Sequence, residues 1–503
     1  MGRSGALVPV LLALVVGAVA CSSSAGDGAS HPDASTTAIK TTTTVDRPAG
    51  PAADLADELT GGKGAFIGSS TPDEHIPGYV EHEYAASGTA TSYQVDGEQG
   101  RDGRWAFSPA GSAGYRTRIL VRRPQDPADF SGTVVVEWLN VSGGVDAGAE
   151  WMSVHEELVR NGDIWVGVSA QQLGVVGGPI LVAAPGGEGV AGMGLKKIDP
   201  VRYGTLEHPG DGYSFDIFTQ VARGLREGGD PVGGVVPQRV LAVGESQSAY
   251  ALTTYANGVQ PLTKEFDGFL LHSRGASGLP VVGDGKSADL ATALGNANPT
   301  IIRTDLGVPV MDLQAESDLT SPLNSLAARQ PDSDTFRLWE VAGTAHADKH
   351  TLGESTASQL DCGVPINDGP LHLVSKAALR ALDTWVEDGD LPPTAPRIEV
   401  TGGEAPAVVR DRDGIAEGGI RTPLVDVPTA TLSGVAGPKP STLCLLLGST
   451  TPFTPERIAE LYATPAEYTE KFGASADKTI AAGFVLADDK PALLAYADPS
   501  AVG

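Results

Sequence analysis

The sequence predicts an α/β fold in which a mostly parallel sheet carries helices on both faces. Three observations support this prediction. The continuous apolar runs 132–140 and 163–169 are typical of strands buried on both faces. The segment 150–161 between them has helical spacing, so strand, helix and strand recur as in βαβ units. A third apolar run, 239–245, ends abruptly in small and polar residues and resumes as a helix to about Asn257.

The remaining elements extend this pattern in both directions. Segments 77–93 and 115–122 are rich in β-branched and aromatic residues, which favours leading antiparallel strands. Further core elements are expected to be a helix over 213–227, strands over 266–272, 308–314 and 335–341, and an amphipathic helix over 371–387. The Gly- and Pro-rich insertions 171–212 and 275–305 are too long for ordinary loops, so we expect them to face the substrate or act as lids.

The composition is that of an acidic, loop-rich globular protein. The 503 residues include 64 Gly and 36 Pro, which indicates many turns but not a disordered chain. The formal net charge is −27, and no Lys/Arg run interrupts it. An acidic surface repels polyanions, so we expect no nucleic-acid partner.

The N-terminus resembles an export signal. Arg3 precedes the apolar run 6–19, and small residues then lead to Cys21, as in a bacterial lipobox whose Cys is lipidated. We therefore expect a signal peptide over 1–20. Ala18 departs from the usual Leu of a lipobox, which leaves ordinary cleavage after Ala20 as an alternative.

Residues 21–55 are expected to form a disordered tether behind the lipidated Cys21. The segment has almost no large apolar side chain and cannot bury enough surface to fold. No later segment is apolar for the roughly 18 residues that a membrane span requires. The predicted contact with the membrane is therefore the lipid anchor alone.

Export also bears on the cysteines. If Cys21 is lipidated, Cys362 and Cys444 remain, an even pair in an oxidising compartment. We expect a disulfide between them. The alternative is two free, buried thiols.

The strand-to-helix turn at 244–248 predicts a nucleophile. Gly244-Glu245-Ser246-Gln247-Ser248 matches the nucleophile-elbow pattern G-x-S-x-G except that Ser248 replaces the last Gly. Small residues there let strand and helix approach closely and leave Ser246 exposed at the carboxyl edge of the sheet. The plainer interpretation is an ordinary strand-to-helix turn.

A Ser nucleophile requires a base and an acid that orients the base. His346 follows the strand 335–341 after a loop of small residues and is the expected base, with His350 as runner-up. Asp318 follows the preceding strand and is the expected acid, with Glu316 as the alternative. Either carboxylate could instead be a helix cap or a solvated loop charge. His346 and His350 lack a third ligand at metal-site spacing, so no metal or other cofactor is expected.

Acyl transfer also requires two backbone N–H donors for the oxyanion of its intermediate. The first is expected at Gln247, directly after the nucleophile. The second should come from the loop after the strand 132–140, and we assign it to Asn140, although the N–H of Leu139 would serve equally.

The chain order Ser246, Asp318, His346 is that of an α/β-hydrolase fold. The sequence also resembles the α/β-hydrolase-domain proteins of actinobacteria and other bacteria. The resemblance rests on the motifs 136–144 (VEWLNVSGG), 244–249 (GESQSA) and 418–428 (GGIRTPLVDVP), and it covers most of 60–490. It implies that the irregular tail belongs to the hydrolase body.

The domain organisation follows from these assignments. We expect a hydrolase domain over 56–395, with its insertions at about 171–212 and 275–305. A C-terminal extension over 396–503 is expected to pack on that domain.

These features together predict a secreted serine hydrolase anchored on the outer face of the cytoplasmic membrane. It would hydrolyse small carboxylic esters through an acyl-Ser246 intermediate. Acyl transfer to an alcohol and amide hydrolysis use the same triad and stay open. The alternative is a non-catalytic or weakly active cell-envelope lipoprotein that binds a small ligand or a partner on the same fold.

Overall fold

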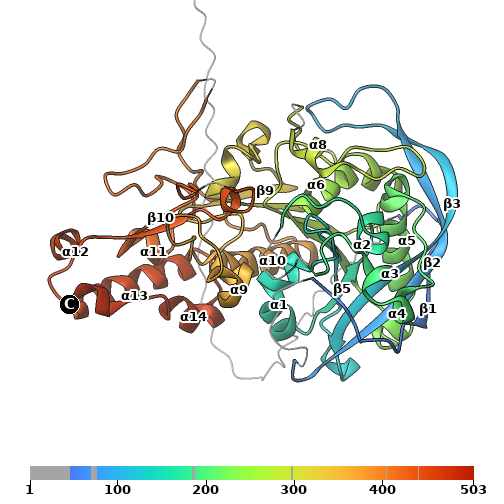
Figure 1. Ribbon diagram of the computed structural model, residues 1–503, viewed down its shortest axis with the longest axis horizontal. Coiled ribbons are helices and arrows are strands. Elements are labelled where there is room, and N and C mark those ends of the chain that lie inside the picture. Colours follow the sequence, from blue (N-terminus) through green and yellow to red (C-terminus); the bar gives the residue numbers. More distant parts are fainter. Residues whose placement is uncertain are drawn as a thin grey trace, which may run out of the picture. The chain divides into compact units, whose positions relative to one another are not determined.

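A sheet of nine strands lies at the centre of the part of the chain that the structure describes (Figure 1). In spatial order the strands are β1 (Asp54–Glu58), β2 (Tyr79–Val95), β3 (Phe107–Pro124), β5 (Ile164–Val168), β4 (Thr133–Trp138), β6 (Arg239–Glu245), β7 (Gly268–His272), β8 (Val310–Ala315) and β9 (Phe336–Val341).

The structure is a computed structural model that describes residues 46–68, 76–183, 187, 189–295, 298–403, 405–439 and 441–503. The predicted signal peptide and Cys21 lie outside these residues. Residues 46–503 form one compact unit.

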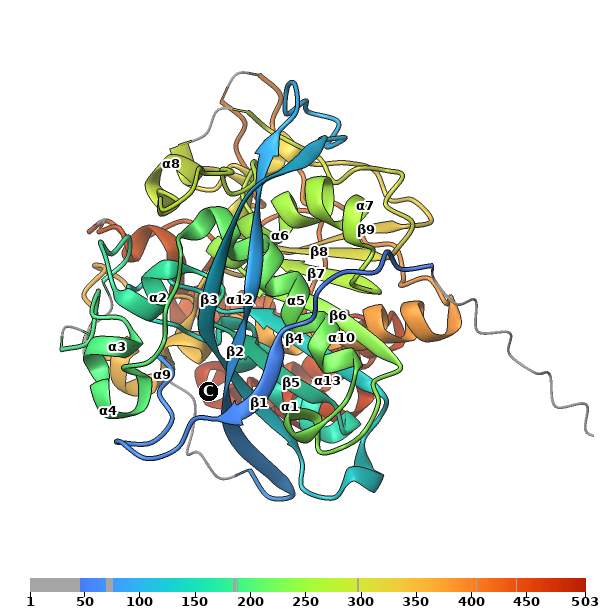
Figure 2. The same cartoon turned by 90° about the vertical axis from the view of Figure 1, so that its right-hand side faces the viewer.

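The sheet is parallel from β5 to β9 and antiparallel at its other end. β5, β4, β6, β7, β8 and β9 pair in parallel, whereas β1, β2 and β3 pair antiparallel and β3 joins β5 antiparallel. Figure 2 shows β2 and β3 as a long twisted ribbon across the front of the molecule. Every residue of β4 to β9 is buried. This is the burial that their apolar runs predict, and the α/β class is confirmed.

Helices cover both faces of the parallel strands. Helices α5 (Ser214–Arg226) and α6 (Gln247–Thr254) pack on one face, in the core that contains Val134 and Val136. Helices α1 (Ala149–Asn161) and α10 (Leu371–Asp388) pack on the other face with Val135. Adjacent strand residues point to opposite faces, so a continuous apolar run supplies both cores at once.

The folded body begins earlier than the sequence predicts. The tether assigned to 21–55 overlaps β1, which pairs with β2, and the N–H of Ala53 donates to the carbonyl of Gln220 at 2.9 Å. Leu55 is buried. An edge strand is stabilised mainly by backbone hydrogen bonds and needs few apolar side chains, so composition alone does not reveal it.

The two insertions carry short helices in place of extended loops. The first contains α2 (Gln172–Val176), α3 (Leu195–Ile198) and α4 (Pro200–Tyr203), and the second contains α8 (Leu290–Gly295). Other short helices are α7 (Gln260–Thr263), α9 (Lys349–Ala357), a 3₁₀ turn over Glu316–Leu319 and another over Cys444–Leu446.

The C-terminal region 396–503 continues the body beyond β9. The N–H of Ala342 donates to the carbonyl of Ile420 at 3.0 Å, and Ile420 bridges Val341 in parallel. Its elements are α11 (Pro423–Asp426), β10 (Ala430–Ser433), β11 (Ser449–Pro452), α12 (Pro455–Leu461), α13 (Pro465–Ala481) and α14 (Lys490–Leu494). Ala476 and Leu493 share a core with Trp339 of β9, so this region packs as part of the same folded body.

Cys362 and Cys444 form a disulfide with their Cα atoms 5.6 Å apart. It joins the segment after α9 to the C-terminal region. Among the described helices, we find none with the length and apolar character needed to cross a bilayer.

Candidate active site

Ser246 lies on a sharp turn between β6, which ends at Glu245, and α6, which begins at Gln247. Its backbone angles are φ 60° and ψ −121°, a region that residues other than Gly rarely occupy. The N–H of Ser246 donates to the carbonyl of His272 on β7 at 2.9 Å. This hydrogen bond helps to hold the strained turn in place.

Gly244 is required by the closeness of strand and helix at this turn. A Cβ atom at Gly244 would lie 2.8 Å from Cβ of Ser248 and 3.1 Å from Cδ1 of Leu252. Both distances are shorter than ordinary carbon contacts. The side chain of Ser248 fits where the elbow pattern has its last Gly, because it is small and fully buried.

His346 connects the nucleophile to a carboxylate. Its Nε2 lies 2.8 Å from Oγ of Ser246, and its Nδ1 lies 2.8 Å from Oδ1 of Asp318. The three residues come from the ends of β6, β8 and β9, which meet at the same edge of the parallel sheet. This arrangement can move a proton from the hydroxyl to the imidazole while the carboxylate holds the ring.

Further hydrogen bonds fix the acid and the base. Oδ2 of Asp318 accepts from Oγ of Ser273 and from the N–H of Ala315, both at 2.7 Å. The N–H of His346 donates to Oγ of Ser317 at 2.7 Å. This leaves Oδ1 of Asp318 to face the imidazole, where it accepts a hydrogen bond from the N–H at Nδ1.

The environment of His346 favours its protonated form. Burial lowers the pKa of His346, but the neighbouring Asp318 outweighs burial and the net pKa is raised above its usual value. Glu245 acts in the same direction and His272 opposes it. The carboxylate thus stabilises the imidazolium that forms when His346 takes the Ser246 proton.

Glu316, the alternative acid, has a structural role. Its carboxylate accepts from the N–H groups of Gly343 and Gly434, each at 2.8 Å, and from the guanidinium of Arg410 at 2.6 Å. It ties the loop before His346 to the C-terminal region. The structure brings Asp318, and not Glu316, into contact with the imidazole of His346.

His350, the alternative base, lies apart from Ser246 as well. Its ring stacks on His372 of α10 with the ring centroids 3.6 Å apart. The neighbouring Asp348 caps α9 by accepting from the N–H of Thr351 at 2.8 Å. His350 therefore belongs to the packing between α9 and α10.

The two expected oxyanion donors differ in the structure. Gln247 is the first residue of α6, where a backbone N–H has no acceptor within the helix. The N–H of Asn140 is already engaged, because it donates to the carbonyl of Ala147 at 2.9 Å, and the N–H of Leu139 donates to Val168 at 3.2 Å. The assignment of Asn140 or Leu139 as second donor is wrong for this structure. The bridge that closes the loop after β4 occupies Asn140, and the neighbouring strand occupies Leu139.

A cavity of about 280 Å³ opens beside Ser246. Its acidic and basic lining residues among those described are Glu245 and His346, and most of the remaining wall is apolar. Aliphatic residues of the wall come from the first insertion, from the segment after β8, from α9 and from the C-terminal region: Leu181, Val182, Leu323, Leu352, Leu443, Leu445 and Leu446. The first insertion therefore faces the site, as expected.

The disulfide supports one wall of this cavity. Cys444 lies between Leu443 and Leu445, and the N–H of Ala347, next to His346, donates to the carbonyl of Leu446 at 3.1 Å. The C-terminal region therefore contributes directly to the site. Its irregular sequence held no signal of this contact.

Two residues that support the site were not predicted from the sequence. Ser273 follows β7 and holds Asp318, while Gln171 accepts from Nε1 of Trp138 at 3.1 Å and contacts the side chain of Gln247. The Gln247 side chain in turn accepts from the N–H of Val141 at 3.1 Å. These contacts join segments far apart in sequence, so no local pattern predicts them.

A comparison with protein-family profiles identifies the family of this chain. The profile described as "Alpha/beta hydrolase domain" matches residues 49–495, and the chain belongs to that family. A search of curated proteins finds no match to the sequence.

Solved structures with a similar fold include several esterases and hydrolases. An esterase of Rhizomucor miehei has 12% identity and a TM-score of 0.30, covering 60% of this chain and 86% of its own. A thermostable esterase of Pseudomonas putida has 12% identity and a TM-score of 0.28, covering 61% and 83%. A serine hydrolase of Xanthomonas campestris has 13% identity and a TM-score of 0.25, covering 50% and 83%. The assignment to the family rests on the profile match.

Proposed function

We propose that this protein is a serine hydrolase that cleaves carboxylic esters through an acyl-Ser246 intermediate. The observation that carries the proposal is the pair of 2.8 Å contacts from the imidazole of His346, one to Oγ of Ser246 and one to Asp318. In the proposed reaction Ser246 attacks the ester carbonyl, and His346 moves the Ser246 proton to the departing alcohol. Water then releases the acid by the same route.

The substrate is proposed to be a small ester with an apolar acyl or alcohol group. The aliphatic wall of the cavity supports this choice, because its described residues include no Lys or Arg that could bind an anionic substrate. Glu245 beside the nucleophile would also disfavour acidic substrates. Burial of apolar surface contributes roughly 25 cal/mol per Å², so longer alkyl chains should bind better until the cavity is filled.

Fluorophosphonate labelling of the folded protein tests the catalytic proposal. We expect labelling of the wild type at Ser246, and hydrolysis of a series of p-nitrophenyl esters that favours apolar acyl groups. Ser248→Ala is a matched control that should be labelled like the wild type, because Ser248 lies in the same turn and its buried Oγ has no hydrogen-bond partner among the described residues. Equal labelling of Ser246→Ala and the wild type would contradict the proposal.

We also propose that the protein is exported and anchored by a lipid on Cys21. The small residues before Cys21 support this, and a disulfide between Cys362 and Cys444 suits an oxidising compartment. Cys21→Ala should move the protein from the membrane fraction to the soluble fraction. A mature wild-type protein that is soluble and starts at an unmodified residue would contradict the anchor.

A further inference from the structure

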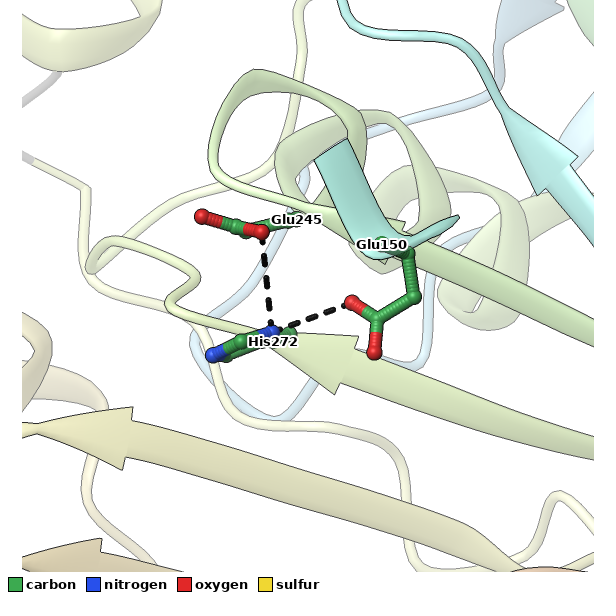
Figure 3. Close-up of side chains that lie close together, drawn as sticks. All are labelled: Glu150, Glu245 and His272. Carbon is green, nitrogen blue, oxygen red and sulfur yellow. Dashed lines mark hydrogen bonds and ion pairs between the residues drawn. The ribbon is translucent and has the colours of Figure 1, made fainter. Parts of the chain in front are cut away.

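A second group of buried titratable side chains lies directly beside the proposed nucleophile. Glu150 comes from the start of α1, Glu245 from the end of β6 and His272 from the end of β7, and their side chains converge (Figure 3). Nδ1 of His272 lies 3.0 Å from Oε2 of Glu150 and 3.8 Å from Oε2 of Glu245. We call these three residues the Glu–His cluster.

The Glu–His cluster is joined to the active site through the backbone and through the cavity. Glu245 is the residue before Ser246, it pairs with His272 across the sheet, and the carbonyl of His272 accepts the N–H of Ser246. Glu245 also lines the cavity together with His346. Any change in the charge of Glu245 therefore occurs next to the reacting atoms.

The charges of the Glu–His cluster do not balance within it. Two carboxylates and one imidazolium leave a net negative charge, and the side chains of Glu150, Glu245 and His272 are at most 6% exposed. Among the described residues, Oε1 of Glu150, Oε2 of Glu245 and Nε2 of His272 have no hydrogen-bond partner. An uncompensated buried charge is unfavourable, so a nearby positive charge that forms during the reaction would be stabilised.

We propose that Glu245 is a positioning residue whose carboxylate stabilises the imidazolium of His346 during acyl transfer, and that His272, which Glu150 holds in its charged form, keeps this carboxylate ionised and in place. The inference rests on the proposed function of Ser246. It assigns a role to residues that lie outside the triad.

The imidazolium forms in both halves of the proposed reaction. When Oγ of Ser246 bonds to the carbonyl carbon, its proton passes to Nε2 of His346, and it leaves on the alcohol as the ester C–O bond breaks. When water attacks the acyl-enzyme, one proton of the water passes to Nε2 of His346, and it passes on to Oγ of Ser246 as the bond between Oγ and the acyl carbon breaks. Glu245 exchanges no proton in either half, and it acts through its charge alone.

The surrounding groups bring the pKa of Glu245 close to neutral pH. Burial raises the pKa of Glu245 to about 7, with His272 and His346 acting to lower it and Glu150 and Asp348 acting to raise it. His272 is the group that holds a positive charge against it. Burial lowers the pKa of His272, but Glu150, Glu245 and Asp318 outweigh burial and bring it to about 9.

Opposite shifts of the pH profile test the proposal. The rate constant of fluorophosphonate labelling, measured from pH 5 to 9, reports the reactivity of Ser246 without a known substrate. Glu245→Gln removes a negative neighbour of His346, so the acid limb should move down by about half a unit to one unit, and the plateau should fall by about tenfold. His272→Gln removes a cation that opposes protonation of both Glu245 and His346, so both groups lose their protons at a higher pH and the acid limb should move up.

Matched variants separate this role from a structural one. Glu157→Gln removes another buried carboxylate of α1, which pairs with Arg160 and Arg380 away from the site, and it should leave the profile unchanged. Glu245→Asp keeps a carboxylate, so the acid limb of the labelling profile should stay at the wild-type pH while the plateau rate constant falls. If Glu245→Gln fails to fold, the upward shift in His272→Gln carries the test.

Three outcomes would overturn the proposal. The first is a wild-type profile and rate in Glu245→Gln, and the second is a shift of both variants in the same direction. The third is one equivalent of zinc bound on addition of ZnCl₂ and lost in His272→Gln but not in Glu157→Gln, which would assign the Glu–His cluster to a cation. Failure of the proposed function is seen separately, as labelling that Ser246→Ala does not abolish.

Discussion

Two histidine–carboxylate pairs lie at the same edge of the sheet, and their surroundings give them different properties. Nδ1 of His346 lies 2.8 Å from Asp318, and Nδ1 of His272 lies 3.0 Å from Glu150. Nε2 of His346 meets Oγ of Ser246 at the cavity, whereas Nε2 of His272 is buried and has no hydrogen-bond partner among the described residues. The same pair of groups is therefore suited to move a proton in one place and to hold a fixed charge in the other.

The carboxylates of the two pairs differ in the same way. Asp318 accepts hydrogen bonds on both oxygens, from His346, Ser273 and Ala315. Glu150 leaves Oε1 without a partner among the described residues. A fully bonded carboxylate is held in one orientation, which a triad requires, whereas an unsatisfied one raises the energy of the charge that it carries.

The largest effect is expected from removing Ser246 or the histidine of the first pair. Ser246→Ala and His346→Ala should each lower kcat by about 10⁶-fold, and the double variant should be scarcely worse, because triad members act as a unit. Steady-state hydrolysis of the best p-nitrophenyl ester measures this. A double variant whose loss equals the product of the two single losses would show that the residues act independently.

Replacing the two acidic candidates should separate catalysis from stability. Asp318→Asn should lower kcat on the order of 10⁴-fold, because the imidazole is then held in the wrong tautomer. Glu316→Gln should keep the activity of the folded protein but lower the free energy of unfolding by about 2 kcal/mol, since it weakens the hydrogen bonds to Arg410 and Gly434. Kinetics and urea unfolding of both variants test the contrast, which exchanged phenotypes would contradict.

The disulfide braces the wall of the cavity on the side of His346. Cys362 and Cys444 are 82 residues apart in the sequence, and the chain-entropy estimate for such a loop is on the order of 4 kcal/mol. The double variant Cys362→Ala, Cys444→Ala should therefore unfold at lower urea and show a raised KM. Reductant should weaken the wild type and leave the double variant unchanged. Alkylation of two thiols in the wild type without reductant would contradict the bridge.

The Glu–His cluster should make the stability depend on pH, and this is the smallest of the expected effects. Burial raises the pKa of Glu245 from 4.5 to about 7, and the carboxylates raise that of His272 from 6.5 to about 9 despite its burial. In both ranges the folded state holds more protons than the unfolded state, so the free energy of unfolding should fall as pH rises from about 5 to 9.

His272→Gln tests the upper part of this pH range. The variant should flatten the decline above pH 7 by about 1–2 kcal/mol, as measured by urea unfolding at several pH values. His82→Gln, at a partly exposed histidine, is the control and should follow the wild type. A free energy of unfolding that rises from pH 7 to 9 would contradict the assigned charges.

The sequence by itself determined the α/β class, the order of strands β2 to β9 along the chain and the position of the elbow. Apolar runs and helical spacing are local patterns, and the small residues at 244–248 report a local steric need. The candidates Ser246, Asp318 and His346 followed from one further rule, that parallel strands end at the same edge. Sequence left Asp318 and Glu316 open, because two positions in one turn differ only in the direction of their side chains.

Only the tertiary structure decided which groups meet. Contacts across the sheet bring Ser273 to Asp318 and His272 to Glu150, over separations of 45 and 122 residues. The edge strand β1 and the cavity wall from the C-terminal region depend in the same way on partners elsewhere in the chain. The hydrogen bond of the Asn140 N–H also depends on folding, because its acceptor is the carbonyl of Ala147, where the loop after β4 closes. Local residue patterns encode the elements, whereas side-chain partners and free backbone donors are set by the packing of those elements against one another.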